Sequence, residues 1–116
     1  MIKVDIDKSN NHFCGLKVTG HANSDEYGKD LVCAAVSTLA QTLCNSVEEV
    51  GNVPEEQMGL EIKEGYLKFS LKEKCQSDEV DIMFKMFVVG VEGIEATYPE
   101  YVKLRIKEVQ GHVKNF

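Results

Sequence analysis

The sequence lacks a long apolar run, an excess of basic residues and closely spaced cysteines. No apolar stretch is long enough to cross a bilayer, so a transmembrane segment is not predicted. Lys3, Asp5 and Asp7 interrupt the first apolar stretch, which argues against a signal peptide, and we expect a cytoplasmic protein with no membrane partner. The net charge of −6 argues against direct nucleic-acid binding. It suits a basic partner, although ordinary solubility explains it equally well.

The cysteine spacing excludes further classes of site. The four cysteines form no Cys-x-x-Cys pair and have no paired histidines nearby, so the sequence predicts neither a metal site nor a cofactor. Nothing in the sequence indicates secretion, and we therefore expect reduced thiols rather than disulfides. The cysteines are Cys14, Cys33, Cys44 and Cys75.

What the sequence contains is enough for one domain, residues 1–116, of which 43% are hydrophobic. Apolar and polar residues alternate over residues 2–7 and 13–19, which predicts two half-buried strands joined by a polar turn. The expected cross-strand pairs are Ile6 with Cys14, Val4 with Leu16 and Ile2 with Val18. Cys14 is then expected in the core. His12 is expected to be exposed in the turn, where it is a poor catalytic candidate.

Two amphipathic helices are predicted, over about residues 31–50 and 78–96. Ser77 is the expected N-cap of the second helix. Gly90 and Gly93 lower its helix propensity, so we expect close packing to require both. The apolar stripe of the first helix is Val32, Val36, Leu39, Leu43, Val47 and Val50, with Cys44 beside it in a structural role. The stripe of the second is Val80, Met83, Phe84, Phe87, Val91 and Ile94.

A hairpin over residues 58–71 and a strand over residues 101–109 complete the expected elements. Glu64 and Gly65 form the predicted two-residue turn, which pairs Ile62 with Leu67 and Glu61 with Lys68. His112 lies in a short polar tail. The order ββαββαβ predicts an α+β fold, in which two helices cover one face of a mostly antiparallel five-stranded sheet.

The candidate catalytic residues lie between the second strand and the first helix. Cys33, in the predicted first turn, would sit near about half a positive charge from the helix dipole, which favours the thiolate. His21 would exchange the thiol proton, and Asp30 would cap the helix or orient His21. In the alternative reading, Cys33 is a small core residue, His21 a satisfied histidine and Asp30 only a cap.

The segment Gly20-His21-Ala22, then Gly28, then Asp30-Leu31-Val32-Cys33-Ala34-Ala35-Val36-Ser37 resembles the ribosomal-processing cysteine proteases, the Prp family. The similarity in length and element order covers essentially the whole chain. The resemblance implies His21 as the base, Cys33 as the nucleophile, Asp30 as the motif aspartate and Ser37 as the motif serine.

The resemblance also implies a small bacterial cytoplasmic endopeptidase that forms homodimers. Its substrate would be a large-subunit ribosomal protein, from which it removes an N-terminal extension after an aromatic-rich motif ending in a small residue. The loop over residues 22–29, with Tyr27 and a hinge at Gly28, would act as a lid or substrate clamp, or else be a plain surface loop. Backbone amides at the helix start, including that of Cys33, would stabilise the oxyanion.

Two alternatives to the protease stay open on the sequence. The first is a ribosome-associated binding module whose Cys33 and His21 are structural. The second is a thiol redox protein, which is weakened because no resolving cysteine is close in sequence to Cys33. Ser37 lies one turn beyond Cys33 and would either touch the site or bond back to a helix carbonyl.

Overall fold

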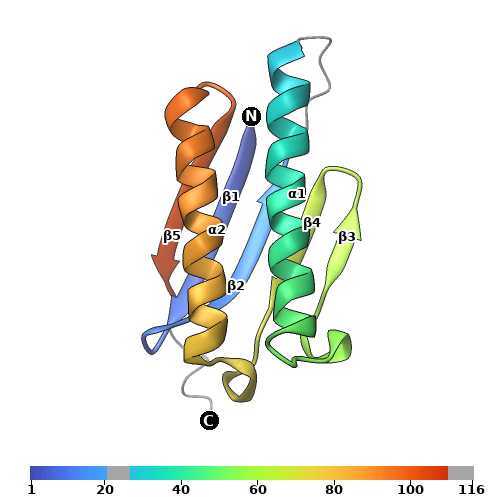
Figure 1. Ribbon diagram of the computed structural model, residues 1–116, viewed down its shortest axis with the longest axis vertical. Coiled ribbons are helices and arrows are strands. Elements are labelled where there is room, and N and C mark those ends of the chain that lie inside the picture. The colour runs from blue at the N-terminus through green and yellow to red at the C-terminus, as the bar shows by residue number, and fades with distance from the viewer. Residues whose placement is uncertain (21–26, 110–116) are drawn as a thin grey trace.

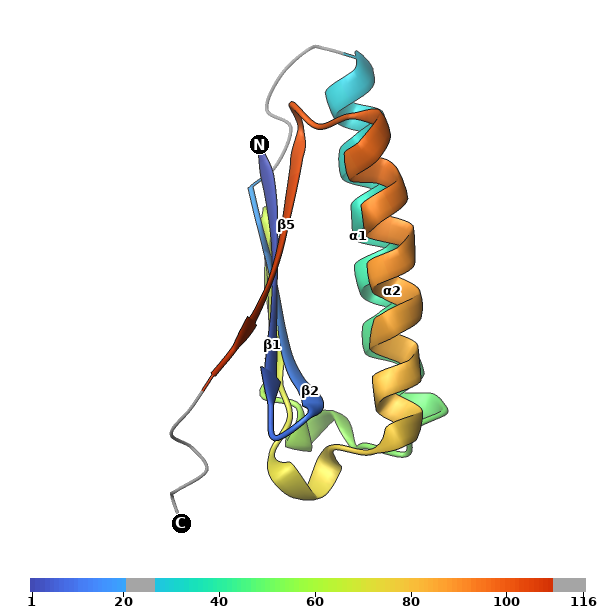
Figure 2. The ribbon, with the colours of Figure 1, turned by 90° about the vertical axis from the view of Figure 1, so that its left-hand side faces the viewer.

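The computed structural model describes the backbone of residues 1–20 and 27–109, and the side chains of residues 1–20 and 31–109. The described part forms a five-stranded sheet in the order β3-β4-β2-β1-β5, with two long helices side by side on one face (Figures 1 and 2). Only the β1–β5 pair is parallel. The elements are β1 (Ile2–Ser9), β2 (His12–Thr19), α1 (Tyr27–Glu49), η1 (Glu55–Gln57), β3 (Glu61–Lys63), β4 (Tyr66–Ser70), η2 (Glu73–Cys75), α2 (Asp78–Thr97) and β5 (Val102–Glu108). The predicted two-layer α+β architecture is confirmed.

The core lies between the sheet and the two helices, because each element buries one apolar face there. The ring of Phe84 on α2 stacks on Phe13 of β2 at 5.1 Å between centroids and tilts against Phe69 of β4 at 5.8 Å. Most of both predicted stripes is buried, including Val32, Val36, Leu43, Val47, Val80, Phe84, Phe87 and Val91. Leu39, Met83 and Ile94 are partly buried, and Val50 is 69% exposed because α1 ends at Glu49. Within the described residues, no helix combines the length and apolar character that a membrane crossing needs.

The predicted register of the first hairpin is wrong by two residues. Ile6 pairs with Leu16 and Val4 with Val18. The two-residue turn of Asn10 and Asn11, both with positive φ, accounts for one residue of the shift, and a β-bulge accounts for the other. A β-bulge at Asp7/Lys8 leaves Cys14 as the extra residue of β2. Cys14 is buried as expected, but it lies outside the main core cluster. Phe13 occupies the helix-facing position instead.

The second hairpin has the predicted register. Glu61 pairs with Lys68, Ile62 with Leu67 and Lys63 with Tyr66, around a turn whose Gly65 has φ +69°. The local signal was sufficient here because a two-residue turn fixes every later pair in the ladder.

The two glycines of α2 differ. A Cβ on Gly90 would lie 2.9 Å from a methyl carbon of Leu39. The helices α1 and α2 can therefore approach each other closely here because Gly90 has no side chain. A Cβ on Gly93 would meet nothing within 4 Å, and the expectation of close packing is wrong there. The N-cap is confirmed, because the Val80 amide donates a 3.1 Å hydrogen bond to the Ser77 hydroxyl.

Candidate active site

A cavity of about 130 Å³ lies between α1 and the end of the sheet formed by β2, β3 and β4. Cys33 is the one cysteine of the four that lines it. The lining residues are Val18, Gly20, Cys33, Ser37, Ala40, Gln41, Ile62, Lys63, Gly65, Tyr66 and Leu67.

The helix periodicity explains one wall of this cavity. Cys33, Ser37, Ala40 and Gln41 follow one another at steps of four, three and one residues, so they share one face of α1. Cys33 is partly exposed and packs against the core, which places a thiol at the rim rather than inside the apolar interior.

The opposite wall is held together by glycines. Gly20 follows β2 with φ +94°, and a Cβ there would lie 2.3 Å from the Met1 carbonyl oxygen, so only glycine fits. Its amide donates a 3.1 Å hydrogen bond to the Gly65 carbonyl in the β3–β4 turn. The end of β2 and the β3–β4 turn therefore form one continuous edge beside Cys33.

The helix that carries Cys33 begins earlier than predicted. α1 starts at Tyr27, so Asp30 is its fourth residue rather than its N-cap, and Cys33 is in the second turn. The acidic residues Asp25 and Glu26 precede this start, and acidic residues are favoured near a helix N-terminus. The dipole argument made for Cys33 therefore weakens, because the effect falls off within the first turn.

The earlier start also corrects the expected oxyanion donor. Only the first four amides of a helix lack an intrahelical acceptor, and Cys33 is the seventh residue of α1. The Cys33 amide is therefore committed to the helix ladder. The predicted loop shortens as well, since Tyr27, Gly28 and Lys29 are helical.

Several predicted residues cannot be placed at the cavity from the structure. His21 and Ala22 lie outside the described residues, as does the rest of the segment up to residue 26. The side chains of Tyr27 and Asp30 are likewise outside the description. Gly20, Cys33 and Ser37 are the predicted site residues that the structure brings together at the cavity.

Ser37 differs from its neighbours on α1. The hydroxyls of Thr38 and Thr42 bond back to the carbonyls of Ala34 and Thr38 at 2.9 and 2.8 Å. The described part of the chain gives Ser37 no such bond, and its side chain is exposed at the cavity. Of the two sequence alternatives, the structure has Ser37 at the cavity and, among the described residues, not bonded back to a helix carbonyl.

The sequence reading missed the wall contributed by β3 and β4. Tyr66 and Lys63 line the cavity, and the Lys63 ammonium lies 5.2 Å from the centre of the Tyr66 ring. Their place beside Cys33 depends on the pairing of Thr19 with Tyr66 between β2 and β4, which are distant in sequence. The Glu64-Gly65 turn was the only sequence signal for this wall, and it does not predict that β4 pairs with β2.

The environments of the cysteines predict the order in which they react with iodoacetamide. Burial, with smaller contributions from Asp7 and Glu108, raises the pKa of Cys14 to about 11. Burial likewise raises the pKa of Cys44, with Glu48 and Glu55 adding to the shift. Because the thiolate is the reacting form, Cys14 at pH 8 has roughly one hundredth of the thiolate of a thiol with the ordinary value. We expect Cys33 and Cys75, both partly exposed, to be modified first.

Peptide mass spectrometry over a time course measures this order directly. Modification of Cys14 as fast as Cys33 in the folded protein would contradict the assignment of their environments. The control is the same iodoacetamide reaction carried out in urea, because unfolding removes the differences in burial among the cysteines.

Comparisons with known proteins show what this chain is similar to in sequence and in fold. A family model described as cysteine protease Prp matches residues 1–103. The ribosomal processing cysteine protease Prp of Staphylococcus aureus is 28% identical over 109 residues, covering 92% of this chain and 100% of that protein. The crystal structure of SMU.848 from Streptococcus mutans has a TM-score of 0.83 at 32% identity, covering 94% of this chain and 96% of that one. The S. aureus Prp structure in complex with a substrate peptide has a TM-score of 0.76 at 25% identity, covering 92% and 100%.

Proposed function

This chain belongs to the cysteine protease Prp family, and we propose that it removes the N-terminal extension of a large-subunit ribosomal protein, with Cys33 as nucleophile and His21 as base. Membership in a protease family sets aside the non-catalytic module and the thiol redox protein. One observation carries the residue assignment. Cys33 lines a cavity with Gly20, and Gly20 immediately precedes His21 in the chain.

The positions of the histidines support His21 over the others. His12 begins β2, about 23 Å of strand before Thr19, and its ring is bonded to Asp81. That end of the sheet is opposite the start of α1 (Figure 1). His112 falls in the tail outside the described residues. His21 is the residue after Gly20 in the chain, and Gly20 lines the cavity with Cys33.

The proposed reaction uses two covalent steps. The Cys33 sulfur attacks the scissile carbonyl carbon while His21 takes the thiol proton. His21 then returns that proton to the departing amine, which leaves a thioester on Cys33. His21 then deprotonates a water molecule, which adds to the thioester carbonyl and forms a tetrahedral intermediate. Collapse of this intermediate releases the carboxylate product, and His21 returns its proton to the Cys33 sulfur.

The oxyanion requires donors other than the Cys33 amide. Ser37 is the nearest cavity-lining hydroxyl along α1, one turn or about 6 Å from Cys33 along the helix axis. We propose that its hydroxyl donates to the oxyanion, because helix side chains tilt toward the N-terminus and so bring the Ser37 side chain toward Cys33. We propose that the substrate binds beside the segment that precedes Cys33, which contains Ala22, Tyr27, Gly28 and Asp30.

The direct test is incubation of the pure protein with an N-terminally extended ribosomal protein, followed by intact-mass measurement. We expect the substrate to lose the mass of its extension. A substrate that stays at full length, with folded protein and reduced thiols present, would overturn the proposed function. The free thiols support our placement of the protein in the cytoplasm, where such a substrate is made.

We also propose that the protein forms a homodimer through α2. Ile82, Met86 and Val89 are spaced by four and three residues on α2 and are 57–69% exposed. Met86 also lines a groove of about 200 Å³ between α1 and α2, whose other walls include the apolar side chains of Leu39, Met83 and Phe87. An apolar stripe beside an apolar groove suits a second copy, because each copy offers both features.

Sedimentation velocity tests the dimer. The wild type is expected at twice 13.0 kDa, and Met86→Lys at 13.0 kDa, because the charge would be buried in the interface. Val50→Lys is the matched control, since Val50 is equally exposed at 69% but lies outside the stripe. A wild-type monomer at micromolar concentration would contradict this proposal and leave the protease assignment unaffected.

A further inference from the structure

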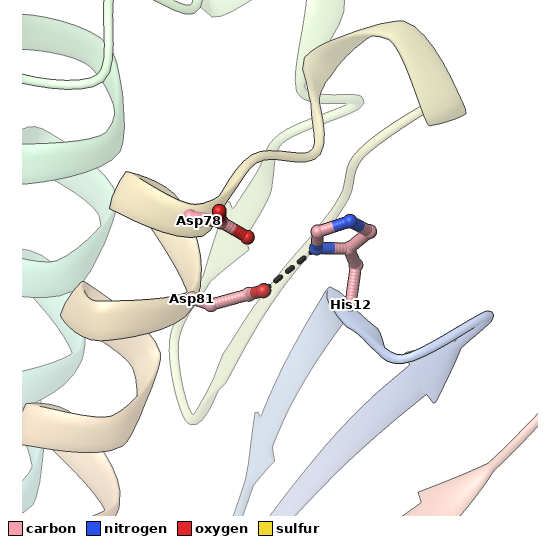
Figure 3. A group of neighbouring side chains, drawn as sticks. All are labelled: His12, Asp78 and Asp81. Carbon is pink, nitrogen blue, oxygen red and sulfur yellow. Dashed lines mark hydrogen bonds and ion pairs between the residues drawn. The ribbon is translucent and has the colours of Figure 1, made fainter.

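A second group of reactive side chains lies at the other end of the molecule from Cys33. His12 begins β2, and Asp78 and Asp81 are in the first turn of α2 (Figure 3). The Nδ1 atom of His12 is 2.7 Å from Oδ2 of Asp81, and the Phe13 amide donates to Oδ1 of Asp81 at 2.8 Å. One nitrogen or oxygen atom from each of the three side chains lies within 4.8 Å of the others.

We propose that His12, Asp78 and Asp81 bind a late divalent transition metal, of which Zn²⁺ is the probe. An imidazole nitrogen and two carboxylates are ordinary Zn²⁺ ligands, and a water would complete four-coordination. A hard ion such as Mg²⁺ is not expected, since it prefers oxygen ligands alone. Tetrahedral bonds of about 2.0–2.1 Å separate ligand atoms by about 3.4 Å, so small side-chain rotations suffice.

The existing hydrogen bond does not prevent this. Nδ1 of His12 now shares a proton with Asp81, and a metal there needs the lone pair of Nδ1 instead. The ring of His12 is 34% exposed, so the proton can move through solvent to Nε2. In the metal-bound form Nδ1 carries no proton and Nε2 carries the ring proton.

The helix terminus opposes a cation less strongly than the carboxylates attract one. The N-terminus of α2 contributes about half a positive charge, whereas Asp78 and Asp81 together carry two negative charges. Asp81 is buried at 8% exposure and held by the Phe13 amide, so one ligand is already fixed. Asp78 is exposed and free to rotate toward the ion.

A buried hydroxyl beside the group offers an independent acceptor for a metal-bound water. Ser9 is 1% exposed, and its Oγ atom has no hydrogen-bond partner. Ser9 is the cross-strand partner of His12, so their side chains lie on the same face of the hairpin, about 5 Å apart at Cβ. A water held by the metal would donate to this hydroxyl and satisfy it.

The expected role is structural. The metal would fasten the β1–β2 hairpin to the start of α2, two segments that are 66 residues apart. The sequence did not reveal this site, because its ligands include no cysteine and lie far apart in the chain. Binding to the folded state alone would raise stability in proportion to the logarithm of the Zn²⁺ concentration.

Histidine ring ¹⁵N NMR on the full-length protein tests the site directly. On titration with Zn²⁺ we expect the Nδ1 signal of His12 to move and its tautomer to change, with a matching rise in melting temperature. Mg²⁺ at the same concentration is expected to change neither. The His12 signals are assigned by their loss in His12→Gln.

A matched pair of variants completes the test. Asp78→Asn is expected to weaken Zn²⁺ binding at His12 by about 10-fold or more. Glu79→Gln removes the same charge from the next exposed residue and is expected to change the affinity less than about twofold. Unchanged His12 signals under Zn²⁺, or equal weakening by both variants, would overturn the proposed site.

Discussion

Cys33→Ala is expected to reduce cleavage of the extended ribosomal protein by more than about 10⁴-fold. The reason is chemical rather than structural. Cys33 is the one thiol at the cavity, and alanine leaves no atom that can form the thioester. Binding and any oxyanion donors would remain, so weak residual catalysis above background is compatible with the proposal. The measurement is the single-turnover rate, from the fraction of substrate that has lost its extension.

The matched control is Cys75→Ala. Cys75 is also partly exposed, but it lies in η2 and does not line the cavity. We expect its variant to cleave at the wild-type rate. Both variants are expected to unfold in urea within about 1 kcal/mol of the wild type, because neither cysteine is fully buried. Undiminished cleavage by folded Cys33→Ala would show that Cys33 is not the nucleophile.

The parts of the fold that the sequence predicted were those with local signals. The Glu64-Gly65 turn fixed the register of β3 with β4, and Ser77 fixed the start of α2. Periodicity identified both helices and their buried faces, because an apolar stripe on a helix is removed from water by packing against the core. These signals agree with one another, so the layered architecture followed from them.

The errors came where local patterns compete. The polar segment from Lys8 to His12 offers several turns, and positive φ at Asn10 and Asn11 selects the shortest. The bulge then exchanges Cys14 for Phe13 on the helix-facing side, which strict alternation cannot anticipate. At α1, Asp30 has the chemistry of a capping residue, but the helix begins three residues before it, at Tyr27.

The candidate site was predictable only along its own segment. Cys33 and Ser37 share a helix face, and Gly20 precedes His21, so short-range spacing grouped them. Tyr66 and Lys63 join the cavity through the β2–β4 pairing, and no short-range pattern encodes which strands are neighbours. The same limit hid the His12–Asp81 contact, which spans 69 residues.

His21→Gln is expected to lower kcat/KM by about 10²- to 10⁴-fold, the usual contribution of a general base. Glutamine keeps polarity and approximate size but cannot accept the thiol proton. His12→Gln is the matched control. It removes the 2.7 Å contact with Asp81 at the opposite end of the sheet, so it should lower stability and leave the rate of the folded protein within about twofold.

The two histidine variants therefore separate chemistry from folding. Urea denaturation measures the free energy of unfolding, and cleavage assays well below the transition measure the rate. If His12 were the base, the pattern would reverse, with a lost rate for His12→Gln and a normal rate for His21→Gln. We expect the first pattern, because Gly20 lines the cavity with Cys33 and His21 is the next residue in the chain.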